Sequence, residues 1–218
     1  MIEAVQITPA PKTLLTQKMN VYKSAYKGTG LCRLFRSEGA YVMIFNANAV
    51  VVGECDEELL NFMRFLGVVT IESEIPVTCD GVSCKAVHYL RRGRVAPNDI
   101  APISDGNLDE LQHIITSAFP KIDFSLWYCD YSHLRRRGLS EGYLYNGSFV
   151  RIDNFLNSYV ITAAASAPES RGKGNMRRLL SAIPIPLITV SEEDTLGFYL
   201  KCGFEQTGGA YLSTINDQ

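Results

Sequence analysis

A short basic turn with two glycines, Arg171-Gly172-Lys173-Gly174, separates an apolar run from a helical pattern. Residues 158–167 before the turn are mostly small or β-branched, which favours a strand. After the turn, apolar residues recur from Met176 to Ile183 at the spacing of one helix face. The first backbone N–H groups of a helix have no partners within it, and the helix dipole is positive there, so phosphate oxygens are favoured ligands. The turn therefore predicts a phosphate-binding loop, in which glycines let the backbone come close and two cationic side chains add charge.

A second segment with a useful chemical group follows at residues 194–203. Leu196, Tyr199 and Leu200 have the spacing of one helical face, and Gly203 stands where a left-handed C-terminal cap is expected. We therefore expect a helix that ends at Gly203, with the Tyr199 phenol on its apolar face.

Together, Pro-Glu-x-Arg-Gly-Lys-Gly and the later Phe-Tyr-x-Lys-x-Gly-Phe resemble the two signature motifs of the GCN5-related N-acetyltransferase (GNAT) superfamily, in order and in separation. The motifs place the resemblance in the C-terminal half only. It implies an α/β (α+β) fold, with a mixed, mostly antiparallel twisted sheet flanked by helices. It also implies that acetyl-coenzyme A is a cosubstrate, with its pyrophosphate held by main-chain amides of the loop.

The family motif Arg/Gln-x-x-Gly-x-Gly/Ala maps onto Arg171, Gly174 and Met176. Met176 stands where a small residue is usual, so either its side chain turns into the core, which we expect, or phosphate binding is weakened. By the same resemblance, the end of the preceding strand separates from its neighbour and pairs its backbone with the pantetheine arm. The implied cofactor-binding residues are Ala165, Ser166, Ala167, Arg171, Gly172, Lys173, Gly174, Asn175 and Met176.

Tyr199 occupies the place of the tyrosine that, in many family members, protonates the departing coenzyme A thiolate. A phenol with a pKa near 10 can donate to a thiolate with a pKa near 8.5 when it is held within hydrogen-bond reach. The structural alternative is an aromatic ring packed on the sheet with its hydroxyl at the edge. Glu192 replaces an asparagine that is common early in this motif, and residues 158–167 contain no acid. Candidates for the general base are Asp130, His133, Glu141 and Asp153.

The composition bounds the class of protein. Of 218 residues, 46% are hydrophobic and 20% are charged, so the chain can bury a substantial core. The 21 Lys and Arg and 23 Asp and Glu give a net charge of −2, which argues against nucleic-acid binding. Local anion binding is an alternative role for the basic clusters at residues 91–94 and 135–137, beside that of a solvated surface.

The sequence also bears on metal binding and on location in the cell. The six cysteines are scattered without a C-x-x-C pair, so we expect no metal site. Residues 1–10 lack a basic segment followed by an apolar core, and no stretch approaches the roughly 20 apolar residues of a membrane span. The sequence therefore predicts a cytoplasmic protein without a membrane partner.

Prolines, a glycine and polar residues cluster at residues 94–107 and suggest a joint. We expect an N-terminal α/β half at 1–95 and a GNAT acetyltransferase domain at 96–218. Asn61–Val68 and Gly197–Phe204 both read as a helix that ends at glycine before a strand, so the first half is either a degenerate repeat with Met63 in place of Tyr199, or a chance likeness.

Further elements follow from local patterns. We expect helices at 56–66 and 108–119, the second capped by Asn107, and a hairpin around Asn146-Gly147. The remaining expected strands are 41–52, 68–72, 158–167, 187–190 and 204–212.

The sequence thus predicts an acyl-coenzyme A-dependent N-acetyltransferase that transfers an acetyl group to a primary amine by direct attack. The partners are acetyl-coenzyme A and an unidentified amine acceptor, and the expected state is a monomer or homodimer. The alternative is a catalytically inactive acyl-coenzyme A-binding regulatory module. A nucleotide-binding protein is disfavoured, because no Gly-Lys-Ser/Thr follows the glycines.

Overall fold

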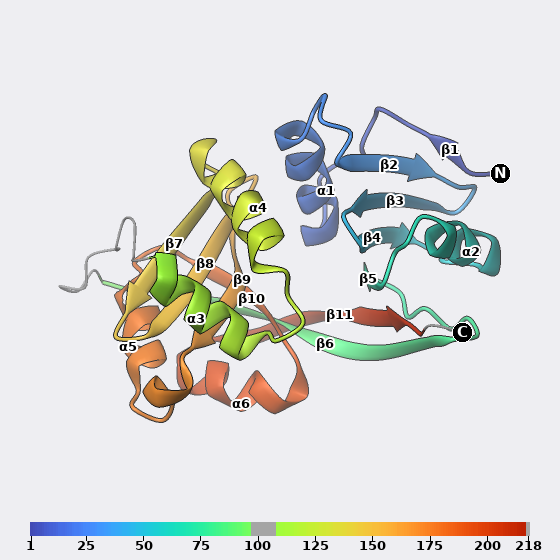
Figure 1. Cartoon of the computed structure of the whole chain (residues 1–218). Coiled ribbons are helices and arrows are strands. Elements are labelled where there is room, and N and C mark those ends of the chain that lie inside the picture. The colour runs from blue at the N-terminus through green and yellow to red at the C-terminus, as the bar shows by residue number, and fades with distance from the viewer. Residues whose placement is uncertain (97–107, 217–218) are drawn as a thin grey trace. The chain divides into compact units, whose positions relative to one another are not determined.

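The computed structural model describes residues 1–96 and 108–216, and it contains two compact units. Unit 1 is Met1–Tyr89 with the segment that begins at Thr207, and unit 2 is Leu90–Gln206. The chain leaves unit 1 along strand β6 (Val82–Arg92) and returns to it along β11 (Glu205–Ile215) (Figure 1). Most of the expected joint at 94–107, with the Asn107 cap, lies outside the described residues. The division into 1–95 and 96–218 stays a prediction, whereas the contacts group the C-terminal strand with unit 1.

Unit 1 is a sheet with strand order β1-β2-β3-β4-β5-β11-β6. Its antiparallel meander β2-β3-β4 is followed by helix α2 and by β5, which runs parallel to β4. The bounds of the elements are β1 Glu3–Ala4, α1 Leu14–Ala25, β2 Cys32–Arg36, β3 Ala40–Phe45, β4 Asn48–Gly53, α2 Glu57–Phe65 and β5 Thr70–Ser73.

The two helices of unit 1 cover opposite faces of its meander. Val42 and Ile44 of β3 are buried in the core that α2 covers with Leu59, Leu60 and Met63. Phe45, the next residue of β3, instead packs edge-on against Tyr22 of α1, with ring centroids 5.1 Å apart. Alternate residues of a strand point to opposite faces, so these contacts place α1 and α2 on different sides.

Helix α2 begins and ends as its sequence predicts. The Asp56 side chain accepts a 2.8 Å hydrogen bond from Leu59 N at the start, and Gly67 follows the end with a φ of 76°. The expected helix at 56–66 is therefore confirmed, as are strands within the ranges expected at 41–52 and 68–72.

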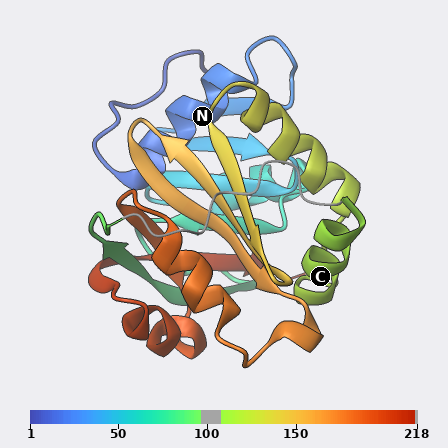
Figure 2. The ribbon, with the colours of Figure 1, turned by 90° about the vertical axis from the view of Figure 1, so that its left-hand side faces the viewer.

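Unit 2 has the strand order β6-β10-β9-β8-β7, in which β10 is parallel to β9 and the β7-β8-β9 meander is antiparallel. Helices α3 and α4 lie on one side of the meander and α5 on the other (Figure 2). The bounds of the elements are α3 Leu108–Ala118, α4 Phe124–Arg136, β7 Ser140–Tyr145, β8 Ser148–Phe155, β9 Ser158–Ser166, α5 Asn175–Ala182, β10 Leu187–Ser191 and α6 Glu193–Lys201.

Each face of the unit 2 sheet has its own core. On one side, Leu179 and Leu180 of α5 pack with Phe204 and with strand residues. On the other side, Ile114 and Ile115 of α3 pack with strand residues. The helices α3, α5 and α6 and the strands β9, β10 and β11 fall where the sequence pattern predicts them.

The two units share a connectivity. Each has a three-stranded antiparallel meander, then a helix, then a strand parallel to the third strand of the meander. In this order α2 takes the place of α5, whereas α6 comes after the parallel strand. By connectivity the helix of Asn61–Val68 therefore does not correspond to the helix of Gly197–Phe204, although both helices end at a glycine with positive φ, Gly67 and Gly203. A degenerate repeat and a chance likeness both stay hypotheses.

Candidate functional site

The basic turn joins β9 to α5 in unit 2. After β9, Pro168–Ser170 forms a single 3-10 turn, and α5 starts at Asn175. Gly172 and Gly174 have φ values of 74° and 76°, which residues with a side chain rarely adopt. A Cβ at either glycine would meet no atom within 4 Å, so the glycines serve the backbone shape and leave open space beside it. The loop therefore presents exposed backbone at the N-terminus of an eight-residue helix.

The β7–β8 hairpin braces this loop. Asn146 and Gly147 form its two-residue turn with φ values of 44° and 71°, as the Asn-Gly pair predicts. Asn175 is buried, and its Nδ2 donates a 3.0 Å hydrogen bond to Asn146 O. Gly147 O accepts a 2.9 Å hydrogen bond from Ala167 N, and a Cβ on Gly147 would lie 2.3 Å from Ser170 Oγ. The turn and the loop are thus fitted closely together.

The side chains of the loop differ in what they contact. The Arg171 guanidinium folds back and donates to the carbonyl oxygens of Ser166 at 3.2 Å and Ser117 at 3.4 Å, while Lys173 is exposed. Met176 is half-buried and packs against the core under α5. Its side chain therefore turns inward, which is the first of the two alternatives stated for it.

Strand β9 carries a bulge beside the loop. Arg151 of β8 pairs with Ala163, whereas its neighbour Ile152 pairs with Ile161, so Thr162 is an extra residue in β9. The bulge reverses the alternation of side chains, because Ile161 and Ala164 both contact the core under α5. In a regular strand, residues three apart would face opposite sides.

The pairing of β9 with β10 ends at this bulge. The register joins Val160 to Ile188 and Ile161 to Thr189, and within the described strands it goes no further. Both strands nevertheless continue, β9 to Ser166 and β10 to Ser191. This agrees with the expected separation of residues 163–167 from the neighbouring strand. We call the point after Ile161 and Thr189, where β9 and β10 separate, the fork. Beyond the fork, β9 carries Ala165 and Ser166, and Ala167 follows the strand.

Tyr199 lies beside the same fork. It extends from α6, is 8% exposed, and its ring packs edge-on against Phe204 with centroids 5.4 Å apart. Its phenol hydrogen-bonds with the side chain of Thr189 on β10. Thr189 pairs with Ile161 of β9 in the last pair before the two strands separate. The sequence predicts Leu200 on the same apolar face, but Leu200 is 46% exposed, so that part of the face is wrong.

Burial raises the pKa of Tyr199 above its ordinary value, and the bond with Thr189 acts in the opposite direction to a smaller extent. A phenol with a raised pKa keeps its proton at neutral pH. Tyr199 is therefore a potential proton donor rather than a base.

The four candidate bases have different surroundings. Asp153 is fully buried, and its carboxylate accepts hydrogen bonds from Ser140 Oγ at 2.6 Å, Arg151 Nε at 2.9 Å and Thr162 Oγ1 at 2.9 Å. Asp130 accepts a 2.7 Å hydrogen bond from Nη2 of the same Arg151 guanidinium. The geometry thus brings Asp130 and Asp153 together through one arginine, with Thr162 as their link to the fork.

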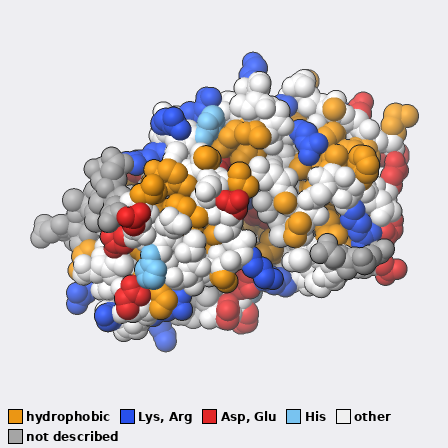
Figure 3. Space-filling model, in the orientation of Figure 1, with side chains coloured by type: hydrophobic (Ala, Val, Ile, Leu, Met, Phe, Trp, Pro, Cys, Tyr) orange, Lys and Arg blue, Asp and Glu red, His pale blue; other side chains and the backbone are white. Residues whose placement is uncertain are grey.

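The other two candidates lie apart from this network. Glu141 accepts a 2.5 Å hydrogen bond from the Tyr143 hydroxyl. His133 accepts a 3.1 Å hydrogen bond from Arg137 Nε on the next turn of α4. Arg136 and Arg137 are exposed there, where Figure 3 shows basic side chains at the end of α4. None of these contacts involves the loop or the fork.

Three parts of the site were not found from sequence. Thr162 and Thr189 carry no motif, and a bulge depends on the register of two strands, so a single strand pattern gives no signal for it. The brace between Asn175 and Asn146 joins segments far apart in the sequence, although the Asn-Gly turn itself was a usable signal.

Within residues 1–96 and 108–216, no group of three or more His, Cys, Asp or Glu side chains is arranged to hold a metal ion. No described helix is both long enough and apolar enough to cross a membrane.

The chain is similar to known proteins in its structure and not in its sequence. No protein-family model matches the chain, and neither does any curated protein sequence. A GCN5-related N-acetyltransferase from Sphaerobacter thermophilus is 14% identical, with a TM-score of 0.56 over 91% of this chain and 86% of that one. A GCN5-related N-acetyltransferase from Kribbella flavida is 8% identical, with a TM-score of 0.61 over 95% of this chain and 97% of that one. An acetyltransferase of the GNAT family from Colwellia psychrerythraea is 10% identical, with a TM-score of 0.52 over 99% and 100%.

These matches correct one expectation. The sequence motifs confine the resemblance to the C-terminal half, but the structural likeness covers more than nine tenths of the chain in all three cases. The chain therefore has the mixed α/β fold of the GCN5-related N-acetyltransferases, with a large sheet flanked by helices.

Proposed function

We propose that this protein is an acyl-coenzyme A-dependent N-acetyltransferase that transfers an acetyl group from acetyl-coenzyme A to a primary amine. One observation carries the proposal. The pairing of β9 with β10 stops at Ile161–Thr189, and the buried Tyr199 phenol bonds to Thr189 at that point. A proton donor thus stands where two parallel strands separate, and one of those strands leads into the basic loop.

The loop and strand residues supply cosubstrate binding in this proposal. The backbone of Arg171–Met176 and the positive end of the α5 dipole take the pyrophosphate, and exposed Lys173 adds charge. The open space beside Gly172 and Gly174 suits a bulky anion. Ala165, Ser166 and Ala167 present backbone with small side chains to the pantetheine arm.

The reaction is a direct transfer. The amine nitrogen attacks the thioester carbonyl carbon, the new C–N bond forms, and the C–S bond breaks with its electron pair on sulfur. Tyr199 gives its proton to the thiolate, the amine nitrogen releases a proton to solvent water as the amide forms, and the Tyr199 phenolate regains a proton from solvent. Holding the two reactants in one fork supplies much of the rate enhancement, because the attack becomes effectively unimolecular.

A second candidate is a catalytically inactive acyl-coenzyme A-binding regulatory module. It is favoured by the state of Asp153, whose carboxylate already accepts three hydrogen bonds, and by the lack of an acid on β9. The two candidates share the binding loop and differ in turnover with an amine.

Calorimetric titration with acetyl-coenzyme A, coenzyme A and ADP tests the shared part. We expect micromolar binding of acetyl-coenzyme A and coenzyme A, and its loss in Gly174→Trp. Gly67→Trp is the matched control, because Gly67 also has a φ of 76° and no atom within 4 Å of an added Cβ. It should carry the same backbone strain and keep the binding. A wild-type protein that binds none of the three ligands would remove both candidates.

A further inference from the structure

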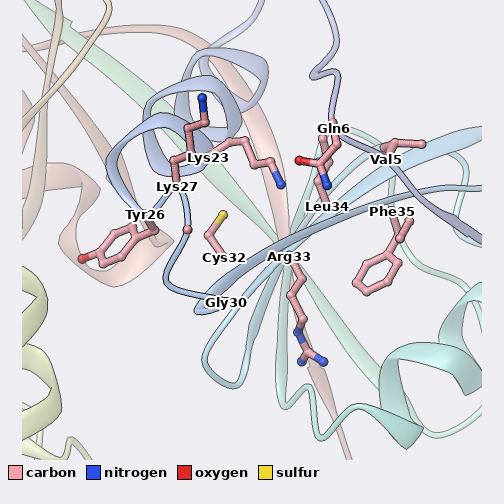
Figure 4. A pocket seen from close by; sticks show the side chains of 12 residues that line it. Val5, Gln6, Lys23, Tyr26, Lys27, Gly30, Cys32, Arg33, Leu34 and Phe35 are labelled. Atoms are coloured by element: carbon pink, nitrogen blue, oxygen red, sulfur yellow. The ribbon is translucent and has the colours of Figure 1, made fainter.

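Unit 1 contains a pocket of about 540 Å³ beside the end of α1. Its walls come from the N-terminal segment around Gln6, the last turn of α1 with the loop after it, and β2 from Cys32 to Phe35 (Figure 4). This volume lies within the range of small-molecule sites, which is about 300–1,000 Å³.

The charges around this pocket have one sign. Lys23, Lys27 and Arg33 line it, and every charged residue of the lining is cationic. The whole chain has more acids than bases, 23 against 21, so composition does not account for the grouping. Within the described part of the chain, none of the three cations forms an ion pair with a carboxylate.

The inner wall is apolar. Cys32, Leu34 and Tyr26 line the pocket, and they are 6%, 2% and 4% exposed. In Figure 4, the Cys32 thiol points to the side of β2 on which Lys23, Lys27 and Gln6 lie. Lys23 is near enough to this thiol to act on it electrostatically. An apolar wall with cations around it matches a molecule that has an apolar body and an anionic head.

The basic turn in unit 2 is a different kind of anion site. There the backbone and a helix N-terminus are offered, whereas this pocket lies at the C-terminal end of α1, where the dipole is negative. The attraction for an anion must therefore come from the side chains of Lys23 and Lys27, because the Arg33 side chain points to the opposite side of β2 (Figure 4). Binding should then depend on those charges and on salt.

We propose that unit 1 binds a small organic anion, with its apolar body against Cys32 and Leu34 and its carboxylate, phosphate or sulfonate head between Lys23 and Lys27. The site is separate from the proposed acetyl transfer, and it gives the first half of the chain a ligand of its own.

A pair of fluorescent probes tests this directly. 8-Anilinonaphthalene-1-sulfonate has an aromatic body and one anionic head, and N-phenyl-1-naphthylamine has the same body without the charge. In the full chain, Lys23→Gln/Lys27→Gln should weaken the sulfonate probe about tenfold, because two ion pairs are lost, and leave the neutral probe unchanged. Lys27→Arg should bind as the wild type does. Lys12→Gln removes an exposed lysine outside the lining and should change neither probe.

Amide chemical shifts locate the bound sulfonate, because such probes also bind other apolar surfaces. We expect the largest shifts at Gly28, Gly30 and Cys32, with acetyl-coenzyme A present to occupy any site in unit 2. Equal binding by the double variant, or shifts confined to residues of unit 2, would overturn the proposal. Circular dichroism of Lys23→Gln shows whether α1 stays folded, and Lys27→Gln, which lies beyond the end of the helix, gives an independent reading.

Discussion

Thr162 Oγ1 donates a 2.9 Å hydrogen bond to Asp153 Oδ2, and Thr162 is the residue that the bulge adds to β9. The acceptor is fully buried, and its other partners are the Ser140 hydroxyl and the Arg151 guanidinium. The point at which β9 separates from β10 is therefore tied to a buried charge network under α4. Through this contact, the shape of the fork depends on Ser140, Arg151 and Asp153, which lie outside the two sequence motifs.

Thr162→Val should remove this link without a change in size. We expect a loss of about 1–3 kcal/mol in the free energy of unfolding, because a buried carboxylate loses a donor. Coenzyme A affinity should persist, since the loop is untouched, and any preference for acetyl-coenzyme A over coenzyme A should shrink as the fork loosens. Urea unfolding and calorimetry measure the two effects. Thr162→Ser keeps the hydroxyl and should restore both values, and a serine variant as weak as valine would show that the hydroxyl is not the cause.

Tyr199→Phe should lower turnover with an amine acceptor by about a hundredfold or more, because the leaving thiolate loses its proton donor. Coenzyme A binding should be unchanged. The assay follows release of free thiol across a panel of primary amines. Tyr41→Phe serves as the control, because that tyrosine lies on β3 of unit 1. Unchanged turnover in Tyr199→Phe would leave the tyrosine with a packing role only.

Asn175→Ala should weaken coenzyme A binding about fivefold, because the loop loses its buried hydrogen bond to Asn146 and that bond is worth about 1 kcal/mol. Arg178→Ala, on the exposed face of the same helix, is the control and should bind nearly normally. Titration of the two variants measures the difference. If Asn175→Ala and Arg178→Ala lose coenzyme A affinity equally, the hydrogen bond between Asn175 and Asn146 is not what holds the loop for binding.

One coenzyme A should bind per chain, although both units have a helix between parallel strands. In unit 1 that helix, α2, starts with Asp56, Glu57 and Glu58, and the Asp56 carboxylate occupies the Leu59 N–H. Negative charge at this end repels phosphate and takes up a donor that phosphate would use. Calorimetric stoichiometry should therefore be near one, and a second site of similar affinity would contradict this argument.

Alkaline pH should destabilise the protein through a buried thiol. Burial raises the pKa of Cys32 from 9.0 to about 11, with Lys23 opposing it. Below pH 9 the thiol is protonated in both the folded and the unfolded chain, so its contribution to stability is fully present. Between pH 9 and about 11 only the unfolded chain loses the proton, so the free energy of unfolding falls, by at most about 1.4 kcal/mol per pH unit.

Urea unfolding at several pH values measures this slope. The slope should be smaller in Cys32→Ala and unchanged in Cys84→Ala, because Cys84 is exposed. A slope that is the same in all three proteins would assign the effect to other groups, such as the buried tyrosines.

Local patterns predicted much of the framework. The helices at α2, α5 and α6 each combine an apolar stripe with a glycine or an acidic cap, and the Asn146-Gly147 turn has a strong local preference for its shape. Helix α1 was missed, because its apolar residues are mixed with polar ones and its cap is a threonine pair rather than an acid. Helix α4 was missed because its buried face consists largely of aromatic residues beside Arg151 of β8, a tertiary contact.

The site was predictable to the extent that it is local. The loop from Arg171 to Met176 and the position of Tyr199 follow from short segments. The fork depends on the register of β9 with two neighbouring strands, and the Asp153 network depends on four segments meeting, so neither has a signature in any one segment. The basic pocket escaped for the same reason, because Lys23 and Cys32 become neighbours only through folding.

The pairing of β5 with β11 has a consequence for synthesis. Residues 70–73 pair with residues 211–214, and the ribosome makes the latter only after the whole of unit 2. During synthesis, β5 therefore has no β11 with which to pair. The first unit therefore spends most of translation with an open strand edge, an arrangement that invites wrong pairing with other nascent chains. Strand β5 has only four residues, which limits the length of edge that such pairing could use.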